Sequence, residues 1–358
     1  MMHLPQPRWP RRRFLRVAAL GAGAALTGGA ASTMAANSSR FPISDHCDGR
    51  RFFNPRGTFD RSFRRLLRWK LAGSATRWPA HVDLTPQPPP PALRDGRIAA
   101  TWINHATFLL QTSHGTLLTD PVWSDRAGPY SSVGPRRVHA PGVRFADLPK
   151  IDIVLLSHDH YDHCDLATLR RLAVRDAPVV ITPLGHRDLL KSAGFAHEKI
   201  VELDWWQTHA PGGTPAITLT PARHWSNRLT GTVNGRLWGG FFLRVGENTA
   251  WFAGDTGYDD RFFREIREKL GEPHLALIPI GAYEPRWFMA PVHCNPAEAV
   301  QIHQDVGARL SIGMHWGTFQ LTDEGREAPP AALAQARQAS GVKPEAFRIL
   351  APGESVVV

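Results

Sequence analysis

The fold is decided by one short stretch, Ser157-His158-Asp159-His160-Tyr161-Asp162-His163-Cys164-Asp165. It directly follows an apolar run, Ile151 to Leu156, with the length and composition of a strand. In an extended segment, side chains two positions apart point the same way, so His158 and His160 can bind one metal ion. The chain then bends into a helix, which offsets Asp162 and His163 toward a second ion. Imidazole and carboxylate suit zinc or a similar divalent metal.

A two-metal site needs further ligands, and three are available at the ends of other apolar runs. His224 follows Ile217-Thr-Leu-Thr-Pro, Asp255 follows Thr249-Ala-Trp-Phe-Ala-Gly, and His315 follows Leu310-Ser-Ile-Gly-Met. Loops at strand ends commonly carry functional side chains on a rigid sheet. The four segments are therefore expected to converge on one edge of the fold.

Beyond Ile98, short apolar runs alternate with helical patterns, which predicts two mixed sheets covered by helices. The expected strands are 107–111, 116–119, 151–156, 179–182, 216–220, 241–245, 249–253 and 275–279. The expected helices are 166–174, 187–193, 261–270 and 296–306.

The order of the ligands, HxHxDH, then His, then Asp in Gly-Asp-Thr-Gly-Tyr, then His, resembles the metallo-β-lactamase superfamily. The resemblance implies an α/β fold, the αββα sandwich of two mixed sheets flanked by helices. One branch is more similar still, the N-acyl-phosphatidylethanolamine-hydrolysing phospholipases D. That similarity runs from about Asp48 to beyond Phe319 and is carried by five segments: Trp102 to Leu109, Pro221 to Trp225, Ile278 to Met289, His293 to Val300, and His315 to Phe319.

This resemblance implies a zinc centre and a substrate. His158, His160 and His224 would bind the first zinc, Asp162, His163 and His315 the second, and Asp255 would bridge both. The expected substrate is N-acyl-phosphatidylethanolamine or a related phospholipid, cleaved at its phosphodiester bond. His293 matches a headgroup-recognition position, although Val292 stands before it where a polar residue is expected.

Two divalent ions would lower the pKa of a bridging water toward neutrality and so generate the attacking hydroxide. Asp162 is expected to orient that hydroxide, and His293 to position the phosphate or protonate the leaving alcohol. An aromatic cluster, Tyr283, Trp287, Phe288 and Met289, is expected either to line a path for acyl chains or to pack in the core. His105, Cys164 and Cys294 are interpreted as buried side chains rather than metal ligands.

The first 36 residues are interpreted as an export leader of the twin-arginine type, which predicts a periplasmic or membrane-associated protein. Arg11, Arg12 and Arg13 precede Phe14-Leu15 and a Gly/Ala/Leu stretch that ends in small residues. The five arginines of this segment account for half of the formal charge of +10. The remaining charge is compatible with an anionic membrane surface or a phosphate substrate, and no nucleic-acid-binding module is recognisable.

Residues 37–97 form an expected extension, and 98–358 the hydrolase domain. Within the extension, Phe63, Leu66, Leu67 and Leu71 share one helical face among basic residues. This helix either packs against the main domain or lies on a lipid headgroup layer. A proline-rich connector, 86–91, follows. Alternative functions for the centre are a lactonase, a soluble phosphodiesterase, or a non-catalytic metal- or lipid-binding protein.

Overall fold

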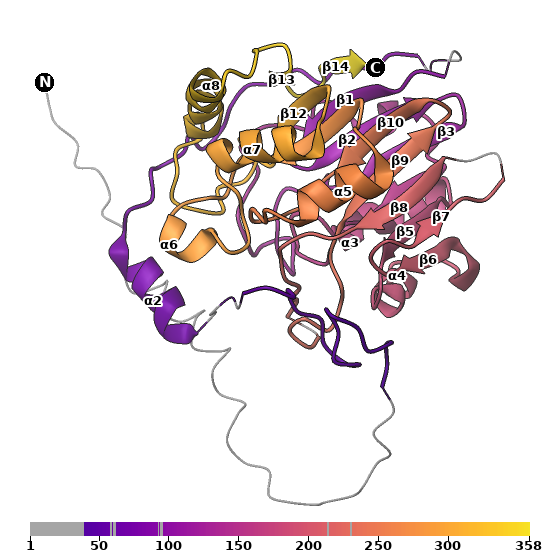
Figure 1. The fold of residues 1–358 in the computed structure, drawn as a ribbon, viewed down its shortest axis with the longest axis horizontal. Coiled ribbons are helices and arrows are strands. Elements are labelled where there is room, and N and C mark those ends of the chain that lie inside the picture. Colours follow the sequence, from indigo (N-terminus) through magenta and orange to yellow (C-terminus); the bar gives the residue numbers. More distant parts are fainter. Residues whose placement is uncertain are drawn as a thin grey trace, which may run out of the picture. The chain divides into compact units, whose positions relative to one another are not determined.

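Strands of the chain pair into two seven-stranded sheets, with the orders β14-β1-β2-β3-β4-β5-β6 and β13-β12-β11-β10-β9-β8-β7 (Figure 1). The computed structural model describes residues 39–57, 59, 62–91, 93, 96–212, 215–229 and 231–358. The predicted leader, residues 1–36, lies outside them. Residues 40–358 form one compact unit.

The first sheet contains the strands on either side of the HxHxDH motif and the last strand of the chain. Its members are β1 (Ala99–Asn104), β2 (Thr107–Thr112), β3 (Gly115–Thr119), β4 (Ile153–Leu155), β5 (Val179–Pro183), β6 (Ile200–Leu203) and β14 (Ser355–Val357). The second sheet contains β7 (Thr208–His209), β8 (Ala216–Thr220), β9 (Gly240–Val245), β10 (Asn248–Phe252), β11 (Leu275–Pro279), β12 (Leu310–Met314) and β13 (Phe347–Arg348).

Seven α-helices accompany these sheets in the described ranges: α2 (Phe63–Ala72), α3 (Leu166–Arg175), α4 (Arg187–Ser192), α5 (Phe262–Leu270), α6 (Arg286–Met289), α7 (Pro296–Val306) and α8 (Ala328–Ser340). Two short 3₁₀ turns are η3 (Phe145–Asp147) and η4 (His197–Lys199). The Asp165 carboxylate caps α3 by accepting from the backbone N–H of Ala167. The helix therefore starts directly after the HxHxDH motif.

Alternate residues of β4 enter two different cores, which shows how the layers are arranged. Ile153 and Leu155 of β4 pack into the cluster shared by the two sheets. Val154 faces the other way, into a second cluster with Leu169 of α3 and Leu190 of α4. Helices α5 and α7 cover the second sheet (Figure 1). The predicted αββα sandwich is confirmed.

Strand directions bring the ligand-bearing ends to one edge of each sheet. β3, β4 and β5 run parallel in the first sheet. In the second sheet β10, β11 and β12 run parallel, and β8 shares their direction because both β8 and β10 pair antiparallel with β9. Segments that follow β4, β8, β10 and β12 therefore emerge at carboxyl edges, where binding residues usually gather.

The N-terminal extension lies against the hydrolase domain through α2, although not through the apolar face expected from sequence. Trp69 is the buried residue of α2, and its indole N–H donates to Asp323 at 2.9 Å. Phe63, Leu66, Leu67 and Leu71 all remain exposed. In the part of the chain that the structure describes, no helix has both the length and the apolar character needed to cross a membrane.

Candidate metal centre

The first half-site consists of three imidazoles from two segments. His158 and His160 follow β4, and His224 follows β8. Nδ1 of His160 lies 2.9 Å from Nε2 of His158 and 3.1 Å from Nε2 of His224. A tetrahedral zinc ion with Zn–N bonds of about 2.0–2.1 Å keeps its ligand atoms roughly 3.3 Å apart. The three nitrogens are therefore placed as the ligands of one ion would be.

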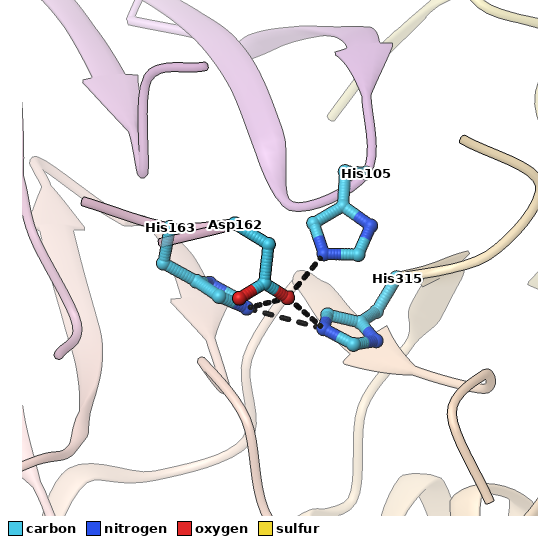
Figure 2. A group of neighbouring side chains, drawn as sticks. All are labelled: His105, Asp162, His163 and His315. Atoms are coloured by element: carbon cyan, nitrogen blue, oxygen red, sulfur yellow. Dashed lines mark hydrogen bonds and ion pairs between the residues drawn. The ribbon is translucent and has the colours of Figure 1, made fainter. Parts of the chain in front are cut away.

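The second half-site consists of Asp162, His163 and His315 (Figure 2). Nε2 of His163 lies 3.1 Å from Nε2 of His315. Oδ2 of Asp162 lies 3.5 Å from the first of these nitrogens and 3.4 Å from the second. Both imidazoles are fully buried, whereas Asp162 is partly open to the adjoining cavity.

Asp255 lies between the two half-sites. Its Oδ2 is 3.1 Å from Nε2 of both His163 and His315 in the second half-site. The same oxygen is 3.9 Å from Nε2 of His158 and 3.8 Å from Nε2 of His224 in the first. Its other oxygen, Oδ1, is buried and has no hydrogen-bond partner in the described segments. This carboxylate is placed to contact an ion in either half-site.

Hydrogen bonds behind the ligands determine which ring nitrogens carry lone pairs. Nδ1 of His224 lies 2.9 Å from the Val292 carbonyl, and Nδ1 of His163 lies 2.6 Å from Asp120. Both oxygens can only accept, so Nδ1 is protonated in each ring and Nε2 is left with its lone pair. His158 is arranged similarly through Ser157, whose hydroxyl donates to Asp120. The donor set therefore fits a pair of divalent ions.

Burial and neighbouring charge give the histidines of the two half-sites different pKa values. Burial and neighbouring histidines hold the pKa of His158 well below its ordinary value, and burial also lowers the pKa of His160 and of His224. Burial would lower the pKa of His315 as well, but the Asp255 and Asp162 carboxylates raise it to about 9. The same carboxylates raise the pKa of His163.

Backbone conformation at the centre is unusual. His315 and Asp120 have positive φ angles of 64° and 31°, which L-residues rarely adopt. Such strain persists only where the surroundings hold it, and it clusters at functional sites. Gly254, directly before Asp255, has φ +62°, and a Cβ there would lie 2.8 Å from the Gly239 carbonyl oxygen. Glycine is required at this position for both reasons.

Two arginines hold the HxHxDH loop from behind. The buried Arg228 donates through Nη1 to the carbonyls of Asp159 and Cys164, at 2.7 and 2.9 Å. Arg236 donates to the Asp159 carboxylate at 2.9 Å. Both follow His224 in sequence, so these bonds tie the segment carrying one ligand to the loop carrying four others.

The two half-sites border a cavity of about 570 Å³ whose walls are largely apolar. Its polar lining includes His160, Asp162, Asp255 and His293. Of the four residues expected along an acyl-chain path, Phe288 and Met289 line this cavity. Tyr283 is buried elsewhere, and Trp287 points outward with its ring 4.7 Å from the Arg68 guanidinium. Residues 286–289 form one helical turn, in which the Trp287 ring packs edge-on against Phe288, with 5.6 Å between the ring centroids, outside the cavity.

His293 and His105 occupy different positions at the centre. His293 lines the cavity, with Nδ1 4.0 Å from Oδ2 of Asp255, and burial lowers its pKa to about 4. His105 is a buried, hydrogen-bonded histidine as expected, but its partner is a site residue: Nε2 lies 2.9 Å from Oδ2 of Asp162 (Figure 2). An ionised Asp162 can only accept, so His105 Nε2 donates.

Sequence reasoning missed this role of His105, and it missed Asp120 altogether. Asp120 accepts from the Ser157 backbone N–H at 2.7 Å as well as from His163. Its place directly after β3, the parallel neighbour of β4, was the available signal. Cys164 and Cys294 are free, buried thiols, as the sequence predicted.

Comparison with known proteins agrees with this geometry. Residues 116–316 match the family model described as the beta-lactamase superfamily domain. This chain belongs to the metallo-β-lactamase superfamily. The matched segment includes the six residues of the two half-sites and Asp255, in the order predicted from the sequence.

Within the superfamily, the chain is related to N-acyl-phosphatidylethanolamine-hydrolysing enzymes. It is 43% identical over 230 residues to N-acyl-phosphatidylethanolamine-hydrolyzing phospholipase D 1 of Caenorhabditis elegans. The matched residues make up 62% of this chain and 64% of the relative. An uncharacterized protein of Mycobacterium bovis is 40% identical over 272 residues. This match covers 74% of this chain and 71% of that protein. The match thus leaves about a third of the nematode protein's length unmatched.

A solved structure supports the fold. Igni18, a metallo hydrolase from the archaeon Ignicoccus hospitalis, superimposes with a TM-score of 0.55 at 22% identity, covering 73% of this chain and 98% of that one.

Proposed function

We propose that this protein is a two-zinc phosphodiesterase that acts on N-acyl-phosphatidylethanolamine or a closely related phospholipid. The observation that carries the proposal is the position of the metal centre beside a cavity with apolar walls. A cavity of about 570 Å³ is large enough for part of an acyl chain as well as a phosphodiester group. The nematode relative's name supports the same substrate class.

The chemistry follows from which side chains face the cavity. Bound divalent ions would lower the pKa of a shared water and neutralise charge on phosphoryl oxygens. Asp162 lines the cavity and can accept a hydrogen bond from the attacking water. His293 lines it too, and no residue in the described ranges hydrogen-bonds to its Nδ1. Its imidazole, which is neutral at neutral pH because its pKa is about 4, can therefore donate an N–H hydrogen bond to a phosphoryl oxygen.

Helix α2 supports contact with a lipid surface. Leu66 and Trp69 line the cavity, while Phe63 and Leu71 on the same helix are 67% and 75% exposed. Arginines and a lysine alternate with them in the sequence FRRLLRWKLA. Exposed apolar side chains among basic ones are typical of a helix that lies on an anionic membrane. A lipid could then pass from the membrane beside α2 into the cavity.

The N-terminal sequence supports export of this enzyme. We propose that residues 1–36 direct the folded chain across the membrane by the twin-arginine route, which delivers it to the outer side of that membrane. Replacing Arg11, Arg12 and Arg13 by lysine should leave the protein inside the cell, as fractionation of periplasm and cytoplasm would show. Equal export of both forms would contradict this route.

A substrate panel tests the proposed activity. Zinc-loaded protein is incubated with N-acyl-phosphatidylethanolamine vesicles, a water-soluble phosphodiester and a lactone. The proposal expects release of N-acylethanolamine and phosphatidic acid, with the vesicle substrate cleaved fastest. Turnover of lactones without any phosphodiester cleavage would favour the lactonase alternative. Cleavage of the soluble diester alone would favour a soluble phosphodiesterase.

His160→Ala and Arg171→Gln provide a matched pair of variants for this panel. The first removes a ligand atom from the first half-site and should abolish turnover, while circular dichroism shows a folded protein. Arg171 lies on α3 with its guanidinium over the Phe145 ring, outside the cavity lining. Its substitution should leave turnover unchanged.

A further inference from the structure

A second cavity, of about 490 Å³, shares Tyr161 with the catalytic cavity and contains none of the metal ligands. Its wall is formed by the loop of residues 124–131, the start of α3 and three arginines, Arg126, Arg170 and Arg228. These guanidinium groups neither bind metal nor line the catalytic cavity, so the proposed reaction gives them no ligand.

Arg228 is the deepest of the three. Its side chain is buried, with 7% relative exposure, and its guanidinium lies 4.0 Å from the centre of the Tyr161 ring. Only Nη1 makes hydrogen bonds within the described part of the chain, both to carbonyl oxygens. No carboxylate of those residues forms an ion pair with it, and the carboxylate of Asp159, whose carbonyl it contacts, pairs with Arg236 instead. A buried cation without a counter-ion is costly, and an anion in the adjoining cavity would offset that cost.

The other two arginines add charge that is little used. Arg170 is exposed on α3 and forms no hydrogen bond or ion pair with any residue the structure describes. Among the residues that the structure describes, the Arg126 side chain donates only to the Gly134 carbonyl, at 2.8 Å. All three guanidinium groups therefore keep donors that a ligand could engage.

Two carboxylates also line the cavity, but in the described part of the chain neither forms an ion pair with the three arginines. Asp165 caps α3 and accepts hydrogen bonds from the backbone of Ser124 and Ala167 and from the Thr168 hydroxyl. Asp125 is 74% exposed and its nearest cation is Arg136, at 4.0 Å. The cavity lining therefore has more positive than negative groups, three guanidinium groups against two carboxylates.

We propose that this second cavity binds a phosphate group, either inorganic phosphate or the phosphomonoester headgroup of a lipid. The planar guanidinium group matches the spacing of phosphate oxygens and holds them by charge-assisted hydrogen bonds. The cavity has room for a phosphate with part of a glycerol unit. Because Arg228 also holds the HxHxDH loop, the bound anion contacts a side chain that supports the metal ligands.

Adjacent arginines on α3 provide the test. Inorganic phosphate is titrated by calorimetry into zinc-loaded wild type, Arg170→Gln and Arg171→Gln, which carry the same change in charge. Arg170 lines the cavity and Arg171 does not. The loss of one charge-assisted donor should weaken phosphate binding about 10-fold in Arg170→Gln. Arg171→Gln should bind as wild type does. Equal affinity in all three proteins would overturn the proposal. It would mean that phosphate binds only at the metal centre or not at all.

The lipid source is distinguished from free phosphate by vesicle sedimentation. Vesicles of phosphatidylcholine are prepared with either phosphatidic acid, a phosphomonoester, or phosphatidylglycerol, a phosphodiester. Preference for phosphatidic acid that Arg170→Gln loses and millimolar phosphate suppresses would identify a lipid headgroup. Calorimetric binding without that preference would identify free phosphate. Arg228→Lys, which keeps the charge but not the planar group, should weaken both.

This site does not depend on the proposed hydrolysis. A protein that cleaves no phosphodiester can still show Arg170-dependent phosphate binding, and an active phospholipase can lack it. The two proposals therefore fail separately.

Discussion

The first half-site offers three imidazoles and no carboxylate of its own, whereas the second combines Asp162 with His163 and His315. In the metal-free protein, this difference decides whether the histidines of each half-site are protonated. The histidines of the first have lowered pKa values and stay neutral, so their lone pairs are available. Those of the second have raised pKa values, so a proton competes there with a metal ion for the Nε2 atoms. Metal ions must compete with protons at only one half of the centre.

Among the changes that compare the two half-sites, Asp255→Asn should produce the largest effect, because Asp255 is the one side chain of the seven that faces both. An amide keeps the shape but removes the charge that would neutralise both ions. We expect kcat/KM for the phosphodiester to fall by about 1,000-fold or more. Steady-state kinetics measures this, with circular dichroism as the control for folding. A fall of less than tenfold would mean that the two halves act without a shared carboxylate.

Acid should empty the second half-site before the first. The pKa of His315 is raised to about 9, so below that pH a metal ion must displace a proton from it. Affinity at the second half-site should fall by about tenfold or more for each unit between pH 8 and pH 6, and less at the first. Metal titrations at several pH values would show this. Parallel loss of both ions would remove the distinction between the halves.

Asp120→Asn should weaken the second half-site while sparing more of the first. Asp120 orients His163 directly, whereas His158 is reached only through the Ser157 hydroxyl. Loss of such a supporting carboxylate typically costs 10- to 100-fold in metal affinity. Competition with a chromophoric chelator would separate the two binding constants. Equal weakening of both ions would show that Asp120 supports the halves equally.

His105→Gln should have the smallest effect. It removes the hydrogen bond from His105 Nε2 to Asp162, which contributes about 1 kcal/mol, or roughly fivefold in affinity at the second half-site. The chelator competition used for Asp120→Asn measures it against an unchanged first half-site. A loss above 100-fold would instead mark His105 as a metal ligand itself.

Much of this architecture was predictable because the sequence repeats one simple pattern. Each ligand follows a short apolar run, and the expected runs 216–220 and 275–279 coincide with β8 and β11. The span of residues 151–163, which holds HxHxDH and its preceding strand, is local, so its geometry follows from strand and helix periodicity alone.

What was missed depends on contacts that are distant in sequence or on exceptions to local rules. The first turn of helix α8 contains Pro329 and Pro330, which interrupt a helical pattern in sequence but are tolerated in a first turn. The role of His105 comes from a bond to a residue 57 positions away. Helix α2 is anchored by Trp69 rather than by its more regular apolar stripe, and the stripe is therefore exposed.

The most direct test of the central claim is anomalous diffraction from crystals grown with zinc. Two ions should appear about 3.5–4 Å apart. One should contact Nε2 of His158, Nδ1 of His160 and Nε2 of His224. The other should contact Asp162, His163 and His315, and both should contact Asp255. A single ion, or ions bound away from these seven side chains in zinc-saturated crystals, would contradict the account.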